Sequence, residues 1–453
     1  MTSSDIKSTF PCCQVPDAIP VARVLGIYPQ VQEGLFMQRV RVPGGVLAGP
    51  QWRALAEAIR RFTPATPLHL TTRQEFELHD LRSEQIPQVQ EALAEAGLTS
   101  LGSGGNALRN VTVCPCSGTS GPDLLPLAGL IQEVLQSREE FFTLPRKFKV
   151  SLSACGEGCG QPWINDLGFA ARQQEGRLGF AVTVAGSLGP RPATAMLLAD
   201  WLDARDVVPL ALAALQVFAA HGDRQNRSQA RLRHVRQRLG DEAFAALIWR
   251  ELDQVRQQQA WPEVILHPAE NRLAGRATLT FHNGDVSAGL ADSIGRLADD
   301  PSLKVRIANH QHVIVFGPDA ATVTAAVAGQ KSLATAALPQ PAIVACPGKR
   351  WCGRALTDTN AQADRLRADL AGKLPADKTI CISGCPNGCA HSRVADIGLV
   401  GLVDSVGGQR RDVYDLYVRG GMGRDARLAE PAGQRLSPQE VLTRILAESG
   451  SAH

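Results

Sequence analysis

The segment Leu70-Thr-Thr-Arg-Gln-Glu-Phe76 decides the fold, because a second version of it appears later as Ile307-Ala-Asn-His-Gln-His-Val313. In this alignment Arg73 corresponds to His310, and Gln74 corresponds to Gln311. Alternation and helical spacing around the first copy predict a strand at 35–42, a helix at 50–62, strands at 67–71 and 75–80, and a helix at 83–96. Residues 278–329 repeat that order, which indicates an internal duplication.

A cysteine-bearing segment follows each copy. Cys114-Pro-Cys116 precedes Cys155-x3-Cys159, just as Cys346-Pro347 precedes Cys385-x3-Cys389. The chain is therefore interpreted as a tandem duplication. We expect an α/β (α+β) fold in which two ferredoxin-like half domains pair about a pseudo-two-fold axis, each followed by a larger domain of mixed sheet and helix.

The expected domain boundaries follow from this repeat. They are an N-terminal arm at 1–34, a ferredoxin-like half domain at 35–105, a mixed domain with a helical extension at 106–262, a second half domain at 263–335 and a second mixed domain at 336–453. Residues 193–259 are rich in Ala, Leu, Arg and Gln at helical spacing, and we assign them to helices.

Composition narrows the class of protein. The 453 residues are 44% hydrophobic and 20% charged, with a net charge of only +3, which is typical of a globular enzyme and not of a nucleic-acid-binding surface. No apolar run reaches the ~20 residues of a membrane span, and the first residues lack a secretory signal, so we expect a cytoplasmic protein with no membrane partner. In that compartment, 11 cysteines favour metal ligation over disulfides.

Four of these cysteines have the spacing of an iron–sulfur site. Cys346 and Cys352 are separated by five residues, and Cys385 and Cys389 by three. Four thiolates are what a cubane cluster needs, and the Gly and Pro residues between them favour open turns that bring distant sulfurs together. Zinc is the alternative metal, but structural zinc sites usually have shorter spacings between paired cysteines, such as C-x2-C or C-x4-C. The set predicts a [4Fe–4S] cluster.

The segment Ser383-Gly-Cys-Pro-Asn-Gly-Cys389, followed by Val394-Ala-Asp-Ile-Gly-Leu-Val-Gly401, resembles the cluster signature of the sulfite and nitrite reductase haemoproteins. Further blocks resemble that family in the same order: Thr71–Gln74, Arg109–Thr112, Leu144–Lys149, Asn165–Asp166, Gly222–Arg227 and Val418–Gly423. The resemblance covers about residues 35–446. It is strongest to the assimilatory sulfite reductase branch.

The resemblance implies a sirohaem beside the cluster, with Cys389 bridging the two. It also implies that Arg73, Arg109, Lys147 and Lys149 surround the substrate anion, where cations fix the oxyanion and donate hydrogen bonds as its bonds break. In the nitrite-reducing branch Asn is typical in place of the second lysine. Lys147-Phe-Lys149 therefore favours the six-electron reduction of sulfite to sulfide over that of nitrite to ammonia.

Sirohaem carries eight carboxylates and needs many donors. Arg224, Arg227 and Arg231, on an expected helical segment, are candidates to bind them, although an exposed helix face is an equally good reading of these arginines. Asn387 and Cys389 complete the set expected to contact the cofactor.

The first-half cysteines have two possible interpretations. Cys114, Cys116, Cys155 and Cys159 form either a second cluster or metal site retained from the duplication, or a set of small buried side chains. The C-x-C spacing is tight for two ligands of one cube.

No flavin or nicotinamide fingerprint is present, so electrons must come from another protein, a ferredoxin or a flavoprotein subunit. Two alternatives to the reductase stay open. One is an oxygenase like precorrin-3B synthase of cobalamin biosynthesis, and the other is a non-catalytic iron–sulfur redox subunit. The four substrate cations favour the reductase.

Overall fold

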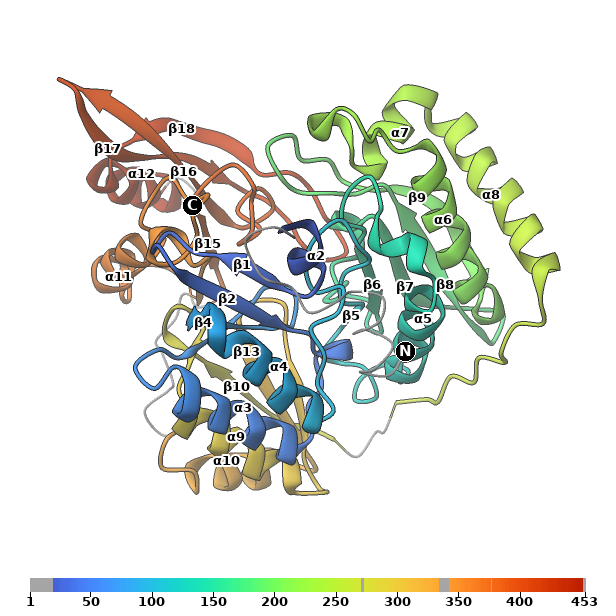
Figure 1. The fold of residues 1–453 in the computed structure, drawn as a ribbon, viewed down its shortest axis with the longest axis horizontal. Helices are drawn as coiled ribbons and strands as arrows, with labels where there is room; N and C mark the ends of the chain where they lie inside the picture. The colour runs from blue at the N-terminus through green and yellow to red at the C-terminus, as the bar shows by residue number, and fades with distance from the viewer. Residues whose placement is uncertain (1–18, 270–272, 334–341, 376, 451–453) are drawn as a thin grey trace.

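The structure is a computed structural model that describes residues 19–269, 273–333, 342–375 and 377–450. Within these residues the strands form four sheets. Figure 1 shows the two ferredoxin-like units together at the bottom of the view, with one mixed domain on each side above them.

The first ferredoxin-like unit has helices on one face of its sheet. Along β4, Phe76 and Leu78 join the apolar core under the helices, whereas Glu77 and His79 point to the opposite face and line a cavity, as strand alternation requires. Its elements are α2 (Ile19–Val24), β1 (Ile27–Pro29), β2 (Leu35–Val40), η1 (Pro43–Gly45), α3 (Gly49–Phe62), β3 (Leu68–Leu70), β4 (Phe76–Arg82), η2 (Ser83–Gln85) and α4 (Ile86–Glu95).

The expected N-terminal arm differs from the structure. Residues 1–18 lie outside the described part, but α2 and β1 both fall within 1–34, and β1 pairs antiparallel with β2. The sheet therefore begins inside the segment predicted as an arm. The strand is only three residues long, too short for alternation to reveal it.

The second ferredoxin-like unit repeats the first. Its sheet order, β10-β13-β12, corresponds to β2-β4-β3. Its elements are β10 (Gly275–Thr280), η7 (His282–Gly284), β11 (Asp285–Val286), α9 (Ala288–Asp299), β12 (Lys304–Ile307), β13 (His312–Gly317) and α10 (Ala320–Ala328).

The two units join into one body. Strand β11 adds to the first sheet beside β3, with Val286 opposite Leu68. Helix α3 packs on α9 where Gly49 faces Gly295, and a Cβ at Gly49 would lie 2.8 Å from the Gly295 carbonyl oxygen, so the close approach excludes larger residues. Trp52 and Ile294 belong to the single core that both units share.

The two aligned glutamines confirm the duplication. Gln74 and Gln311 both have positive φ, at 62° and 59°, and both are buried. The Gln74 amide binds both backbone groups of Val113 at 2.7 and 2.9 Å, and the Gln311 amide binds both of Ala345 at 2.9 and 3.2 Å. Val113 directly precedes Cys114, and Ala345 directly precedes Cys346.

The first mixed domain has a sheet in the order β5-β6-β7-β8-β9, parallel from β5 to β7 and antiparallel thereafter. Its elements are β5 (Thr112–Val113), α5 (Leu125–Gln136), η3 (Glu139–Phe142), β6 (Val150–Ser153), η4 (Pro162–Ile164), β7 (Leu167–Gln174), β8 (Arg177–Val184), β9 (Met196–Asp203), η5 (Ala204–Asp206), α6 (Val207–His221), η6 (Arg227–Gln229), α7 (Leu232–Leu239) and α8 (Asp241–Gln258).

Two expectations about this domain are wrong. Residues 196–203 form β9 and are not helical, because their backbone completes the sheet beside β8. The segment with Arg224, Arg227 and Arg231 is a loop with one short 3-10 turn, since the Asp223 side chain accepts the backbone N–H groups of Gln225 and Asn226 and turns the chain.

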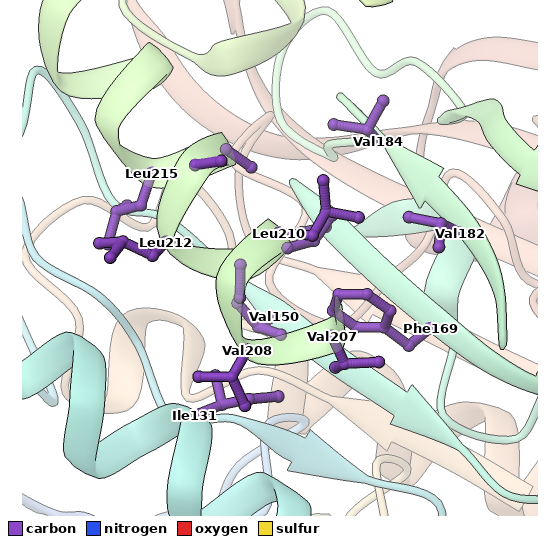
Figure 2. Close-up of a cluster of buried hydrophobic side chains, with 14 of the residues drawn as sticks. Ile131, Val150, Phe169, Val182, Val184, Val207, Val208, Leu210, Leu212 and Leu215 are labelled. Carbon is purple, nitrogen blue, oxygen red and sulfur yellow. The ribbon is translucent and has the colours of Figure 1, made fainter. Parts of the chain in front are cut away.

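Helix α6 forms the centre of the largest apolar core. Its side chains are buried almost all round, between the sheet on one side and α5 and α8 on the others. Figure 2 shows Val207 and Leu210 of α6 against Phe169 and Val182 of the sheet, and Val208 beside Ile131 of α5. This core fixes the sheet from which the first-half site residues project.

The second mixed domain has the same topology. Its sheet order is β14-β15-β16-β17-β18, with the same change from parallel to antiparallel pairing. Its elements are β14 (Ala342–Ala345), η8 (Gly348–Arg350), α11 (Thr359–Leu370), β15 (Thr379–Ser383), β16 (Ile397–Val406), β17 (Gln409–Val418), β18 (Glu430–Leu436) and α12 (Pro438–Gly450). Of the helices described, none is long and apolar enough to cross a bilayer.

Candidate cofactor and anion site

Every residue that the sequence singled out for the reductase site lines one cavity of about 1110 Å³, bounded by both halves of the chain. The expected anion ligands there are Arg73, Arg109, Lys147 and Lys149; the expected cluster ligands are Cys346, Cys352, Cys385 and Cys389; and the expected haem contacts are Arg224, Arg227, Arg231, Asn387 and Cys389. The hydroxyl of Thr72 donates to the Cys389 carbonyl at 2.8 Å and so ties the Arg73 turn to the cysteine loop.

The cavity wall is strongly basic. Among the described residues, 11 Lys and Arg side chains line it, against only two carboxylates. Glu77 is paired with Arg39 at 2.5 Å, and burial raises the pKa of Glu75. The wall thus keeps a large excess of positive charge after the pairs Arg39–Glu77 and Arg231–Asp166 are counted, and an anionic occupant would be stabilised.

Lys147 and Lys149 face the cavity from an extended segment just before β6. Phe148 between them is fully buried on the other side, and its backbone bridges to Leu108. Burial, then the charge of Arg109, lowers the pKa of Lys147 to about 7. Burial and the charges of Arg73 and Lys147 hold the pKa of Lys149 well below its ordinary range. Within the described chain neither ammonium group has a hydrogen-bond or ion-pair partner.

The two predicted arginines are held rigidly. Arg73 donates to the Asn110 carbonyl at 2.6 Å and to the Asn165 side chain at 3.0 Å, and burial lowers its pKa to about 10. Arg109 donates to the carbonyls of Ser103 and Gly105. Both guanidiniums are oriented by neutral carbonyl or amide oxygens, so their charge is left to the cavity.

The four second-half cysteines follow two neighbouring parallel strands, β14 and β15, whose carboxyl ends meet at one edge of the sheet. The Gly384 N–H donates to the Cys346 sulfur at 3.2 Å, as expected of a group that stabilises a thiolate. The loop to Cys352 is anchored by Trp351, whose ring stacks on His79 at 3.9 Å and whose carbonyl accepts the Val31 N–H.

The haem-contact arginines differ in how they are held. Arg231 forms a bidentate pair with buried Asp166, at 2.8 and 3.0 Å, and Asp166 also accepts the Lys149 backbone N–H at 2.9 Å. Arg224 donates to the Thr143 carbonyl at 2.6 Å. Arg227 is exposed. Arg231 therefore supports the lysine segment as well as reaching the cavity.

Sequence reasoning missed other cavity residues: Arg23, Tyr28, Arg39, His69, His79, Arg146 and Arg354. Two of them had a local signal, since Arg146 adjoins Lys147 and Arg354 lies two positions after Cys352. Arg23 and Arg39 had none, because only the tertiary packing brings α2 and β2 to the cavity wall.

The four first-half cysteines also come together. The sulfurs of Cys114, Cys116, Cys155 and Cys159 all lie within 4.8 Å of one another, which makes them a group that could hold a metal. Hydrogen bonds among the four thiols lower the pKa of Cys155 and leave those of Cys114 and Cys159 raised, so one thiolate is favoured within the group. The metal site that the sequence left open for this set is thus assembled. None of its members lines the cavity.

Two family models match the chain. The nitrite and sulphite reductase 4Fe-4S domain matches residues 104–255 and 341–448, and the nitrite/sulfite reductase ferredoxin-like half domain matches residues 28–96. A basic cavity bounded by cysteines defines the class as an oxidoreductase that uses an iron–sulfur cluster. The chain belongs to the nitrite and sulfite reductase family, whose cofactors are a [4Fe–4S] cluster and sirohaem.

Several relatives extend over nearly the whole chain. The ferredoxin–nitrite reductase of Synechococcus elongatus is 32% identical over 94% of this chain and 88% of its own length. The assimilatory ferredoxin-dependent nitrite reductase of Haloferax mediterranei is 31% identical over 93% of this chain and 80% of its own. The structure of the Mycobacterium tuberculosis NirA protein superposes with a TM-score of 0.80 at 23% identity, covering 98% of this chain and 87% of that one, which confirms the fold.

The comparisons confirm the family and the expected fold class, but not the expected branch. The relatives from Synechococcus elongatus and Haloferax mediterranei are named as nitrite reductases, whereas the lysine pair had favoured the sulfite branch. The residues fit the family's cofactors, because the cavity has thiolates at one wall and unpaired cations at another.

Proposed function

We propose that this chain catalyses the six-electron reduction of a small oxyanion inside the cavity, with sulfite preferred over nitrite. The observation that carries the proposal is the pair Lys147 and Lys149. These are two ammonium groups without partners, on the wall of the cavity that the four second-half cysteines also line. Buried cations without counterions need an anion in the site.

In this proposal Cys346, Cys352, Cys385 and Cys389 hold the [4Fe–4S] cluster, and Cys389 lies at its junction with the sirohaem. When bound, these cofactors supply the electrons and the metal on which the anion is reduced. Arg224, Arg227 and the Nη1 group of Arg231 would hold haem carboxylates, together with Asn387. This assignment is supported by the position of all eight side chains in the lining of one cavity.

The four substrate cations would divide the work between binding and proton supply. Arg73 and Arg109, fixed by carbonyl and amide oxygens, orient the anion through charge-assisted hydrogen bonds. Lys147, whose pKa of about 7 lies close to neutrality, would donate a proton as an oxygen leaves and then be reprotonated from solvent. Lys149, whose pKa lies well below its ordinary value, would make the second lysine contact with the anion.

Nitrite is the second candidate substrate. It is favoured by the names of the relatives that match nearly the whole chain. Sulfite is favoured by lysine at position 149, the one place where the family resemblance separates the two anions. Both anions are small and negative, so the same four cations would bind either.

We further propose a ferredoxin as the electron donor, since the two relatives described above are named as ferredoxin-dependent enzymes. A flavoprotein subunit is the alternative. Comparing turnover with a reduced ferredoxin and with a reduced flavoprotein separates the two.

The decisive experiment is a visible spectrum of the purified chain, followed by turnover with reduced viologen and either sulfite or nitrite. We expect isobacteriochlorin absorption, turnover of both anions and a higher kcat/KM for sulfite. Protein without that absorption would reject the reductase and favour a tetrapyrrole oxygenase. Haem-replete protein that reduces neither anion would favour a non-catalytic redox subunit.

A further inference from the structure

The first-half cysteines form a site of their own, closed off from the cavity. Cys114 and Cys116 follow β5, and Cys155 and Cys159 follow β6, the parallel neighbour of β5. Their four sulfurs lie within 4.8 Å of one another, and the Cys114 and Cys155 sulfurs are 3.4 Å apart. Cys114 is 1% exposed and belongs to the large apolar core.

The sulfur spacing discriminates between one ion and a cube. Four thiolates on one tetrahedral ion, each at about 2.3 Å, lie about 3.8 Å from one another. Four thiolates on the corners of a [4Fe–4S] cube point outward from four separate irons and lie about 6 Å apart. A set that fits within 4.8 Å matches the single ion and leaves no room for a cube.

We propose that Cys114, Cys116, Cys155 and Cys159 bind one tetrahedral zinc ion as a closed structural site. Zinc takes four-cysteine shells of this kind readily and needs no redox chemistry there. Four protein ligands leave no position open for substrate, and the site lies outside the basic cavity.

A disulfide does not explain the same cysteines. The closest pair is separated by 3.4 Å, whereas a disulfide bond is about 2.05 Å long. All four thiols are free. Incidental packing does not explain them either, because four sulfurs from two separate loops converge on one point, including the half-buried Cys116 and the exposed Cys159.

The backbone around the set favours the compact geometry. Cys116 lies in a tight turn in which the Ser117 N–H donates to the Cys114 carbonyl at 3.0 Å and the Thr119 N–H donates to the Cys116 carbonyl at 3.1 Å. In the second half, Cys352 instead comes after the longer loop that carries η8. The short turn places the Cys114 and Cys116 sulfurs on the same side of a single bound ion.

The zinc ion would fix a first-half loop that contacts the second half of the chain. The loop from Cys155 to Cys159 contacts the second half, because the Glu157 carbonyl accepts the Arg424 N–H at 2.9 Å and the Cys159 carbonyl accepts the Asn309 side chain at 3.4 Å. A Cβ at Gly158 would lie 2.8 Å from both the Arg424 backbone nitrogen and the Gly423 backbone carbon, so this contact is close. An ion that fixes the loop would therefore position the interface.

The test uses the purified holoenzyme after treatment with a chelator. Elemental analysis is expected to find about one zinc per chain beside the about five irons of one cluster and one haem. X-ray absorption at the zinc edge should show four sulfur neighbours near 2.3 Å and no nearby iron. Nine irons without zinc, a four-sulfur site holding iron, or a chain that retains no metal at this set would each overturn the proposal.

A matched pair of variants locates the ion. Cys155→Ser should lose the zinc and keep the iron content and the visible spectrum, whereas Cys381→Ala, a buried thiol outside both sets, should lose neither. Zinc retained by Cys155→Ser would contradict the assignment. If Cys155→Ser fails to fold, X-ray absorption at the zinc edge of the unmodified chain decides alone. Because these readouts are independent of turnover, they separate failure of the zinc site from failure of the proposed reductase.

Discussion

The two cysteine sets occupy equivalent places in the two halves but differ in spacing and surroundings. Each begins just after the first strand of its sheet and ends with C-x3-C after the second. The first-half sulfurs lie within 4.8 Å of one another and away from the cavity, whereas the second-half cysteines line it. Under the two proposals, the comparison teaches that the two copies of one duplicated domain would hold different metal centres because the loop to the second cysteine differs in length.

The most severe test of this difference is the change Cys389→Ser. We expect kcat/KM to fall by at least about 10³-fold, because the change removes the proposed link between cluster and haem. Iron content should drop by about four per chain, while zinc stays at the level of the unmodified protein. Turnover and metal content measured on the same preparation check this. Loss of zinc together with iron would mean that the two sets are not independent.

The next largest effect is expected from the unpartnered lysines. Lys147→Met removes a cation proposed to contact the substrate anion, so kcat/KM should fall roughly 10²- to 10³-fold. Cofactor content should be unchanged, because no hydrogen-bond partner is left unsatisfied. Steady-state kinetics with reduced viologen provides the measurement. The control is Lys378→Met, because the half-exposed ammonium of Lys378 pairs with Asp396 and does not line the cavity, and this variant should retain full activity. An equal loss in both variants would refute the special role of the cavity lysine.

The pH dependence should follow the same lysine. Burial lowers the pKa of Lys147 to about 7, so its positive charge is present below that pH and is lost as pH rises through it. Haem carboxylates move this limb upward, because a negative neighbour favours the ammonium form. Affinity for nitrite, which stays ionised in this range, should therefore decline by up to about tenfold per pH unit on the alkaline side.

The measurement is KM for nitrite from pH 6 to 10, in the unmodified protein and in Lys147→Met. The variant should have low affinity at every pH and no alkaline limb from this residue. A limb that persists unchanged in the variant would assign the titration to another group.

A smaller change is expected when the substrate ratio is examined. Lys149→Asn should shift the ratio of kcat/KM values by roughly tenfold towards nitrite, since it replaces a cation by a neutral donor at the position that separates the two anions in the family resemblance. Parallel assays with sulfite and nitrite check this. Unchanged relative rates would remove position 149 from the determinants of specificity.

The smallest expected effects concern stability and test the duplication itself. Gln74→Ala and Gln311→Ala should each lower the free energy of unfolding by about 1–3 kcal/mol, because each leaves buried backbone groups without partners, those of Val113 and the Ile307 carbonyl in one case and those of Ala345 in the other. Denaturant unfolding measures both. Gln88→Ala on the exposed face of α4 should change stability by less than about 0.5 kcal/mol. Clearly unequal losses at Gln74 and Gln311 would show that the two halves no longer share this support.

Much of the fold was predictable because the repeat doubles each local signal. The helices around Trp52 and Ile294 and the turns at Gln74 and Gln311 lie where alternation and helical spacing put them. The elements that the sequence did not predict are strands that form only through pairing with neighbouring strands. Strand β1 is three residues long, and β9 is a strand only because β8 offers it an edge.

The predicted site residues were also brought together, and they line one cavity. The roles of the arginines were harder to foresee. Arg231 pairs with Asp166, which lies 65 residues away in sequence, and Arg39 reaches the cavity from a strand with no motif. Such pairings form between distant segments, and spacing along the chain has no information about them.

The sequence by itself determined the duplication and the two cysteine sets, and it indicated the four cations proposed for the substrate site, because each is carried by residue type and short spacing. Only the tertiary structure decided how far apart the sulfurs lie and which set borders the cavity. That depends on how each loop docks: Trp351 stacks on His79 and extends the second-half loop along the first sheet, whereas a tight turn holds Cys116 beside Cys114. Packing between distant segments sets these distances, and in the zinc proposal the distances select the metal centre.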